Sequence, residues 1–155
     1  MSVALVTGAS TGIGAATAVR LSREPGTELV LVARREELLR ELAESLPCRA
    51  TYLSVDLTAA DAPERVRTHL EAEHGGRLDL LVNNAGAAWR GDFAETGYAH
   101  VQRHMELNFD AVLRLTESLC RCCGPPPPAR SSTSPAPPAG SPAPAPAPTR
   151  PASLP

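Results

Sequence analysis

A glycine-rich segment near the amino terminus, residues 7–14 (Thr-Gly-Ala-Ser-Thr-Gly-Ile-Gly), has the composition of an anion-binding turn. It follows an apolar run at residues 3–6 and precedes a helix-like segment at residues 15–23. Glycine permits positive φ and close approach of the backbone to a ligand, and a helix start offers unpaired N–H groups at the positive end of its dipole. The spacing G-x-x-x-G-x-G therefore predicts a phosphate-binding turn. The alternative is a strand-to-helix turn whose glycines serve packing alone.

Three further groups of polar residues follow apolar runs later in the chain. They are Arg34 and Arg35 after residues 28–32, Asp56 after residues 50–55, and Asn83-Asn84-Ala85-Gly86 after residues 78–82. In parallel sheets, ligands bind outside the carboxyl ends of the strands. We therefore expect these groups and the glycine turn to lie on one rim.

The elements that would position these residues alternate between strand and helix. The pattern predicts strands at 3–6, 28–32, 50–55 and 78–82, and helices at 15–23, 35–46, 63–74 and 98–119. Such alternation indicates an α/β fold, a Rossmann-type doubly wound parallel sheet with the spatial strand order 3-2-1-4. On the last helix the expected buried face is Val101, Met105, Phe109, Val112 and Leu115.

The composition changes abruptly near Leu119. Thirteen of the sixteen prolines lie from Pro125 onward, where no acidic residue occurs. A proline- and alanine-rich segment of this kind cannot build a core. We therefore expect a folded domain at residues 1–119 and a disordered tail at residues 120–155.

Charge and cysteine usage exclude several function classes. The net charge of −2 gives no basic footprint for nucleic acid, and no apolar run is long enough to span a membrane. Three of the four cysteines crowd into residues 120–123, which fits neither a disulfide framework nor zinc-ligand spacing, and the four histidines share no metal-ligand pattern. The expected compartment is the cytoplasm, with no metal site.

Together with the glycine spacing, Val55-Asp56-Leu57, Asn83-Asn84-Ala85-Gly86 and Asn108 make residues 3–119 resemble the N-terminal part of the short-chain dehydrogenases/reductases. The resemblance implies an NAD(P)-dependent oxidoreductase that interconverts a small carbonyl and an alcohol by hydride transfer. It also implies that Asp56 contacts the adenine, that residues 83–86 line the adenosine side, and that Asn108 holds a water in a catalytic proton relay. The implied cofactor-binding residues are Gly8, Ser10, Thr11, Gly12, Ile13, Gly14, Asp56, Leu57, Asn83, Ala85 and Gly86.

Charge favours NADP(H) over NAD(H) as the cofactor. NAD enzymes usually carry an acid after the second strand that bonds the ribose 2′-hydroxyl. Here residues 32–35 read Val-Ala-Arg-Arg, and the first acid after the second strand is Glu36. A guanidinium binds a 2′-phosphate through charge-assisted bonds, whereas a carboxylate repels it. We expect Arg34 to bind the phosphate first and Arg35 second; the alternative is an ordinary solvated first helical turn.

The catalytic residues of the family have no counterpart in this sequence. Related enzymes use a serine and a Tyr-x-x-x-Lys segment, whereas this chain has only Tyr52 and Tyr98, both too early, and no lysine. The resemblance therefore implies a chain truncated after the fourth strand and the long helix and catalytically incompetent. A family-type oligomer is not expected.

The tail suggests a cause for this loss. Read in a shifted frame, the codons of residues 130–135 can spell Val-Val-Asn-Val-Ser-Ser, and those of residues 148–152 can spell Tyr-x-x-Ser-Lys. The serine and the tyrosine of these two readings are thirteen codons apart. This favours a frameshift near Leu119. The alternative is a genuine proline-rich tail on a non-catalytic nucleotide-binding or interaction protein.

Overall fold

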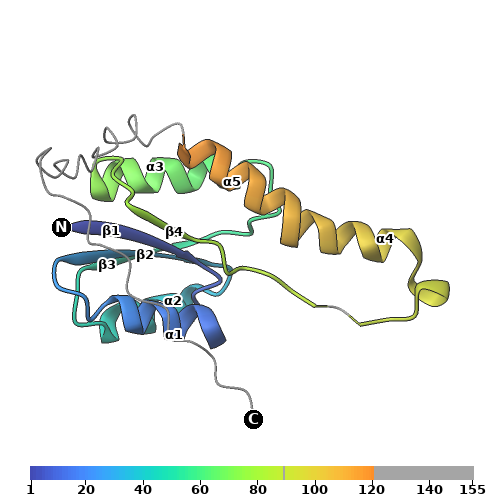
Figure 1. Cartoon of the computed structure of the whole chain (residues 1–155), viewed down its shortest axis with the longest axis horizontal. Coiled ribbons are helices and arrows are strands. Elements are labelled where there is room, and N and C mark those ends of the chain that lie inside the picture. The colour runs from blue at the N-terminus through green and yellow to red at the C-terminus, as the bar shows by residue number, and fades with distance from the viewer. Residues whose placement is uncertain (89, 121–155) are drawn as a thin grey trace, which may run out of the picture. The chain divides into compact units, whose positions relative to one another are not determined.

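A computed structural model of the chain describes residues 1–88 and 90–120 (Figure 1). The strands are β1 (Ser2–Thr7), β2 (Thr27–Ala33), β3 (Ala50–Ser54) and β4 (Leu80–Val82). The helices are α1 (Gly12–Leu21), α2 (Glu36–Ser45), α3 (Ala62–His74), α4 (Phe93–Met105), the π-helical turn η1 (Glu106–Asp110) and α5 (Ala111–Cys120). The predicted tail at residues 120–155 lies, apart from Cys120, outside the described residues, so its disorder stays a prediction.

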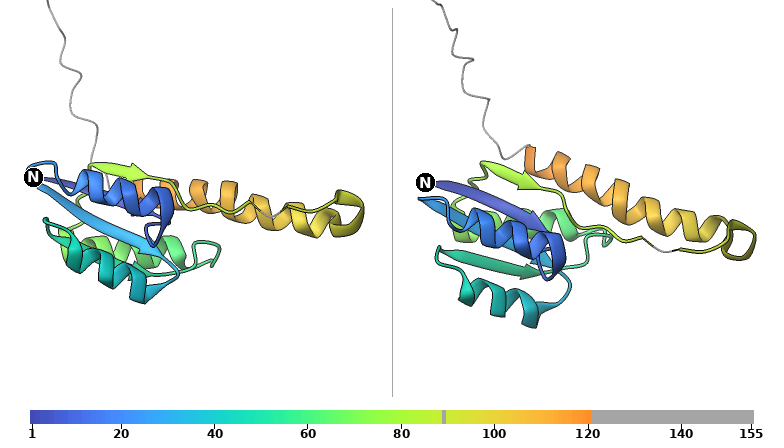
Figure 2. Two further views of the ribbon diagram at one scale, coloured as in Figure 1. Left: turned by 90° about the horizontal axis from the view of Figure 1, so that it is seen from below. Right: turned by 60° about the horizontal axis from the view of Figure 1, so that its bottom comes forward.

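The four strands form one parallel sheet in the order β3-β2-β1-β4. Helices α1 and α2 cover one face, while α3 and α5 cover the other (Figures 1 and 2). This arrangement confirms the predicted α/β, Rossmann-type class and the strand order. Among the described strands, β4 is an edge strand, paired only with β1.

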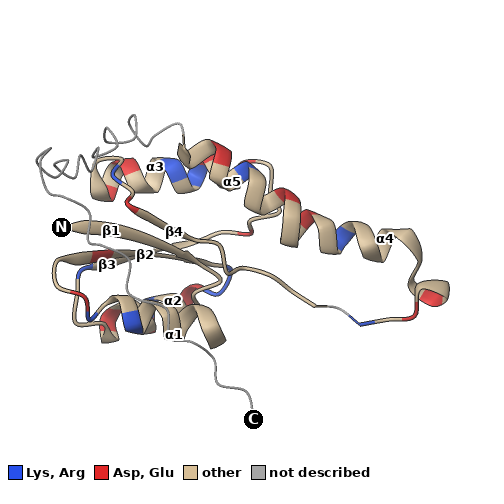
Figure 3. Ribbon diagram, in the orientation of Figure 1, with Lys and Arg blue, Asp and Glu red and all other residues tan. Residues whose placement is uncertain are grey.

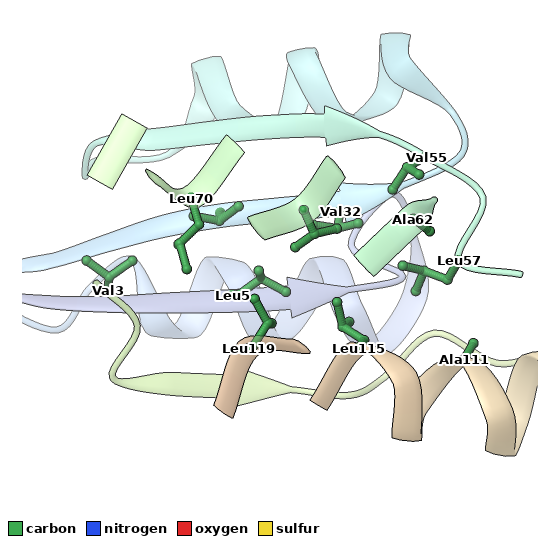
Figure 4. Packing of buried hydrophobic residues seen from close by; sticks show 12 residues of the cluster. Val3, Leu5, Val32, Val55, Leu57, Ala62, Leu70, Ala111, Leu115 and Leu119 are labelled. Atoms are coloured by element: carbon green, nitrogen blue, oxygen red, sulfur yellow. The ribbon is translucent and has the colours of Figure 1, made fainter. Parts of the chain in front are cut away.

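Residues of β1 and β2 alternate between two apolar cores, which is why both strands read as continuous apolar runs. On one face Leu5 and Val32 pack with Leu70 of α3 and Leu115 and Leu119 of α5 (Figure 4). The core on the opposite face consists of Ala4, Val6, Ala9, Ala18, Leu29, Leu31, Ala33 and Leu39. The central strands are thus fixed from both sides, and so is the position of the loops that follow them.

Local sequence signals explain where the helices begin and end. Pro63 lies in the first turn of α3, where a missing N–H group costs nothing, and Gly75 ends that helix with φ 61°. The Asp92 carboxylate caps α4 by accepting the Ala94 N–H at 2.9 Å. None of the helices in the described part of the chain combines the length and apolar composition that a bilayer crossing requires.

The predicted helix at residues 98–119 is wrong in its start and in part of its buried face: Leu115 is buried as predicted, but Val101, Met105 and Phe109 are not. Helical structure begins at Phe93, bends at Gly97 (φ 65°) and passes through the π-helical turn before α5. The buried side chains are Ala111, Leu115 and Leu119, whereas Val101, Met105, Phe109 and Leu113 are exposed. Two causes combine: α4 extends beyond the sheet (Figure 1), and the wider turn shifts the helical phase between its two ends.

Two leucines on α5 test this corrected face. Leu115 is 1% exposed and Leu113 is 54% exposed. We expect Leu115→Ala to lower the free energy of unfolding by about 2–5 kcal/mol, because it leaves a cavity between α5 and the sheet. The matched control, Leu113→Ala, should change it by less than about 0.5 kcal/mol. Urea denaturation measures both, and equal losses would contradict the assignment.

Candidate functional site

The glycine turn is a close-packed loop between β1 and α1. Gly8 and Gly12 have φ values of 65° and 60°, which side-chain-bearing residues rarely adopt. A Cβ atom at Gly14 would lie 2.3 Å from the Gly8 carbonyl oxygen, so only glycine fits there. The three glycines let the chain fold tightly back into α1, whose first turn carries no acidic residue. This is the geometry that presents N–H groups and a positive helix end to an anion.

A buried threonine ties this turn to the loop after β4. The Thr7 hydroxyl donates to the Val82 carbonyl at 3.2 Å and accepts the N–H groups of Asn84 and Ala85 at 2.9 and 3.0 Å. The Asn84 side-chain amide donates in turn to the Thr7 carbonyl at 3.0 Å. The hydroxyl thus uses its one proton and both lone pairs. The sequence analysis placed Thr7 in the glycine turn and Asn84 in the Asn-Asn-Ala-Gly loop but did not predict the contact between them, although a threonine ending an apolar strand is a usable signal.

The loops at the carboxyl ends of the strands enclose a cavity of about 320 Å³. Nine of the residues predicted to bind cofactor line it: Gly8, Ser10, Thr11, Arg34, Arg35, Asp56, Leu57, Ala85 and Gly86. Ala33, Val55 and Leu107 complete the lining and were not predicted. The structure therefore brings the four separated sequence groups together on one rim, as parallel-strand topology requires.

The other predicted residues lie around this cavity rather than along its wall. Gly12, Ile13 and Gly14 form the start of α1, and the Ile13 side chain is exposed. The side-chain amide of Asn83 donates a hydrogen bond to the Thr116 hydroxyl at 3.2 Å, and this bond attaches the loop to α5. These residues shape the rim without contributing to the cavity lining.

Asn108 lies in the π-helical turn and holds the backbone of Ala87 at two points. Its side-chain oxygen accepts the Ala87 N–H at 3.0 Å, and its side-chain amide donates to the Ala87 carbonyl at 2.9 Å. Gly86 passes so close that a Cβ atom there would lie 2.9 Å from the Asn108 side-chain oxygen. The side chain predicted to hold a catalytic water therefore fixes the loop after β4 in this structure.

Arginines and one carboxylate set the charge of the cavity. Arg35 donates from Nη2 to the hydroxyls of Ser10 and Thr11 at 3.2 and 2.8 Å, which places its guanidinium on the glycine turn. Hydrogen bonds from the Thr58 N–H and hydroxyl, helped by the charge of Arg34, lower the pKa of Asp56 below its ordinary value. The cavity thus combines one hydrogen-bonded carboxylate, Asp56, with the guanidinium groups of Arg34 and Arg35.

Metal chemistry finds no support within residues 1–88 and 90–120. No group of three histidine, cysteine, aspartate or glutamate side chains there could hold a metal ion. The cavity offers instead what a nucleotide requires: glycines, hydroxyls, guanidinium groups and one carboxylate.

The sequence profile of the short chain dehydrogenases matches residues 2–123. The chain belongs to the short-chain dehydrogenase family. This confirms the resemblance of the N-terminal part and makes the chain a member of an oxidoreductase family. The family assignment also explains why the glycine turn, Asp56 and the Asn-Asn-Ala-Gly loop occur together.

Relatives and solved structures agree with this membership. The chain is 33% identical over 118 residues to an uncharacterized oxidoreductase of Staphylococcus epidermidis and 36% identical over 132 residues to sepiapterin reductase of Mus musculus. These alignments cover 75% and 79% of the chain but 50% and 49% of the relatives, so the chain spans about half of their length.

Two solved structures show the same relation. The L-sorbose reductase of Gluconobacter frateurii, complexed with NADPH and L-sorbose, superimposes with a TM-score of 0.72 at 34% identity, covering 78% of this chain and 47% of that chain. A metagenomic short-chain oxidoreductase in complex with NADP gives a TM-score of 0.71 at 36% identity, covering 78% of this chain and 56% of that chain.

The Thr7 contacts lead to a stability prediction. Thr7→Val keeps the shape of the side chain but leaves the N–H groups of Asn84 and Ala85 without their acceptor. We expect a loss of about 1–3 kcal/mol per unsatisfied group, reduced where water can enter. Thr7→Ser keeps the hydroxyl and should retain most of the stability. Thermal unfolding compares the two, and a Val variant as stable as wild type would disprove the role of this hydroxyl.

Proposed function

We propose that this short-chain dehydrogenase binds NADP(H) in the cavity on the carboxyl rim, in preference to NAD(H). The observation that carries the proposal is the pair Arg34 and Arg35 at that rim, without a carboxylate at the end of β2. A 2′-phosphate gains charge-assisted bonds from guanidinium groups, and a carboxylate at the same place would repel it. The NADPH- and NADP-bound structures of related enzymes support this choice.

The contacts of the two arginines give them different parts in the proposal. Arg35 already lies on Ser10 and Thr11, so these hydroxyls and its guanidinium would hold the 2′-phosphate together. The charge of Arg34 acts on Asp56, and Arg34 would add a second positive charge to the phosphate site. We therefore give Arg35 the direct role and Arg34 the supporting one, which reverses the order expected from sequence alone.

The remaining rim residues would bind the rest of the dinucleotide. The glycine turn and the start of α1 would take the pyrophosphate through N–H groups and the helix dipole. Asp56 would accept a bond from the adenine amino group, because its lowered pKa keeps it ionised at neutral pH. Asn83, Ala85 and Gly86 would border the adenosine, on the loop that Thr7 and Asn108 fix. When bound, the nicotinamide would supply the hydride.

We further propose that the 155-residue chain does not complete the family's reaction. Carbonyl reduction needs a proton donor near the arriving hydride, and the sequence has no lysine and only Tyr52 and Tyr98. Tyr52 packs with the core beneath α2, and Tyr98 lies on the exposed face of α4. Neither lies on the nucleotide cavity. A frameshift near Leu119 would account for the missing serine and tyrosine segment, and an intact relative would act on a small carbonyl or alcohol in the cytoplasm.

The second candidate is a non-catalytic nucleotide-binding or interaction protein. The observation that favours it is the proline-rich composition of residues 125–155. Such a segment could bind to the proline-recognising grooves of partner domains. Both candidates bind a nucleotide in the same cavity. They differ in whether the gene also encodes the catalytic serine and tyrosine segment of the family.

The cofactor preference is testable without a nicotinamide. Isothermal titration should show that the chain binds 2′,5′-ADP more tightly than 5′-AMP. Arg35→Ala should reduce this ratio by about one to two decades, because a charge-assisted contact contributes roughly 1.5–3 kcal/mol. Arg34→Ala should reduce it less, and Arg23→Ala, an exposed arginine on another loop, should leave it unchanged. Equal binding of both nucleotides by the wild type would overturn the proposal.

Activity is tested on two proteins made from the same gene. The 155-residue chain should show no NADPH oxidation with a panel of ketones and aldehydes, because a positioned acid contributes about 10²–10⁴-fold and is missing. Restoring the shifted frame from about Leu119 should produce turnover. Turnover by the 155-residue chain, or its absence in a soluble frame-restored protein that binds NADPH, would each contradict the proposal.

A further inference from the structure

A second polar cluster lies at the amino-terminal edge of the sheet, at the opposite end of the strands from the nucleotide cavity. Glu28 and Thr51 are the second residues of β2 and β3, and His74 is the last residue of α3. Charged residues of both signs meet at this edge (Figure 3). The His74 side chain is fully buried and that of Glu28 is 16% exposed. Polar groups this buried must satisfy one another.

Four side chains form a continuous hydrogen-bonded series. His74 Nδ1 lies 2.9 Å from Glu28 Oε2, and His74 Nε2 lies 2.9 Å from the Thr51 hydroxyl. On the other side of that hydroxyl, His69 Nε2 lies 3.2 Å away. One hydroxyl therefore joins two imidazole rings of α3 to the sheet.

The carboxylate fixes the direction of these bonds. An ionised Glu28 can only accept, and it already accepts from Arg49 Nη1 at 3.0 Å, so His74 must donate from Nδ1. In neutral His74 the other nitrogen, Nε2, is then an acceptor, and the Thr51 hydroxyl donates to it. Since the hydroxyl proton is used there, His69 must donate from Nε2 to the Thr51 oxygen. When both rings are neutral, this arrangement satisfies both nitrogens of His74, the Thr51 hydroxyl proton and His69 Nε2.

A proton placed on His74, beside the Glu28 carboxylate, can be accommodated only by reversing this series, whereas a proton placed on His69 at Nδ1 would leave the series unchanged. Protonated His74 donates from both nitrogens, so the Thr51 hydroxyl must turn and donate to His69. His69 must then become an acceptor at Nε2 and carry its proton on Nδ1. A second added proton makes both rings donors toward Thr51, and the hydroxyl proton loses its acceptor.

We propose that Glu28, His74, Thr51 and His69 form a pH-sensitive relay that takes up one proton at His74, beside the Glu28 carboxylate, and excludes a second, and that the uptake inverts the tautomer of His69. The relay connects the end of α3 to the amino ends of β2 and β3. Its protonation state therefore changes how this helix is attached to the sheet.

The surrounding charges are compatible with this behaviour. From the loop before β3, Arg49 bonds Glu28 and also the Glu73 carbonyl at 2.8 Å. Burial, helped by the charge of Glu28, raises the pKa of the Cys48 thiol. Burial is the main cause that lowers the pKa of His69; Glu73 raises it and His74 lowers it further. A His69 pKa below the unfolded value of about 6.5 means that the unfolded chain binds the proton more readily, so this contribution to stability is lost as pH falls below about 6.5.

Long-range ¹H–¹⁵N correlation spectra of the ¹⁵N-histidine-labelled chain between pH 8.5 and 5 test the relay. At pH 8.5 we expect the Nε2–H tautomer for His69 and Nδ1–H for His74. The first protonation should convert His69 to the Nδ1–H tautomer, and the second should follow at least about one pH unit lower. A His69 that keeps Nε2–H until it is itself protonated, or two histidines that titrate independently, would overturn the proposal.

Two variants of Thr51 separate the relay from simple proximity. Thr51→Val removes the hydroxyl and should abolish the tautomer change of His69, whereas Thr51→Ser keeps the hydroxyl and should preserve it. A Val variant that still shows the tautomer change contradicts the relay. Because the wild-type spectra decide the question alone, a Val variant that fails to fold does not leave it open.

Discussion

The buried hydroxyl of Thr7 is the contact on which the nucleotide rim depends. It stands at the end of the central strand β1 and bonds three backbone groups of β4 and the loop that follows it. Together with the Asn84 side-chain amide, which donates to the Thr7 carbonyl, this junction ties the glycine turn to the Asn-Asn-Ala-Gly loop. With it, Gly8 lies so close to Ala85 that a Cβ atom would meet the Ala85 backbone at 2.9 Å. The Thr7 hydroxyl is buried among apolar side chains, where losing one of its hydrogen bonds costs more free energy than it would in water. This hydroxyl therefore holds the loops of the rim in place.

The two ends of the sheet carry different chemistry for the same topological reason. Parallel strands place all their carboxyl ends on one edge and all their amino ends on the other. The carboxyl edge collects glycines, hydroxyls and arginines suited to an anion, with Arg35 held by Ser10 and Thr11. The amino edge collects Glu28, Thr51 and two histidines of α3, which bond one another rather than a ligand. The first edge opens to the cavity of about 320 Å³, and at the second edge Glu28 also lines a separate cavity of about 360 Å³.

The sequence predicted what depends on short-range pattern. Glycine spacing located the turn, and alternating apolar runs gave the strand order, because parallel topology leaves few choices. It did not predict contacts between distant segments, such as Thr7 with Asn84, or the preference of Arg35 over Arg34 for the glycine turn, which depends on side-chain direction. The first half of the predicted face of the last helix was wrong, while Leu115 is buried as predicted, because periodicity assumes an unbroken helix and the π-helical turn at Asn108 breaks it. The histidines of the amino edge were judged only as metal ligands, and their hydrogen bonds depend on how α3 packs.

The position of β4 beside β1 has a consequence for the order in which the chain assembles. Strand β2 meets β1 over a separation of 25 residues, whereas the segment leading into β4 meets β1 over 76 residues. Closing the longer loop costs about 1 kcal/mol more in chain entropy. The β1–α1–β2 unit, with its glycine turn and arginines, can therefore form first. The part of the cavity that Ala85 and Gly86 line is added when β4 pairs with β1. The part of the cavity formed by the glycine turn and the arginines is thus a local structure, while the part formed by the Asn-Asn-Ala-Gly loop depends on a strand pairing with a much larger sequence separation.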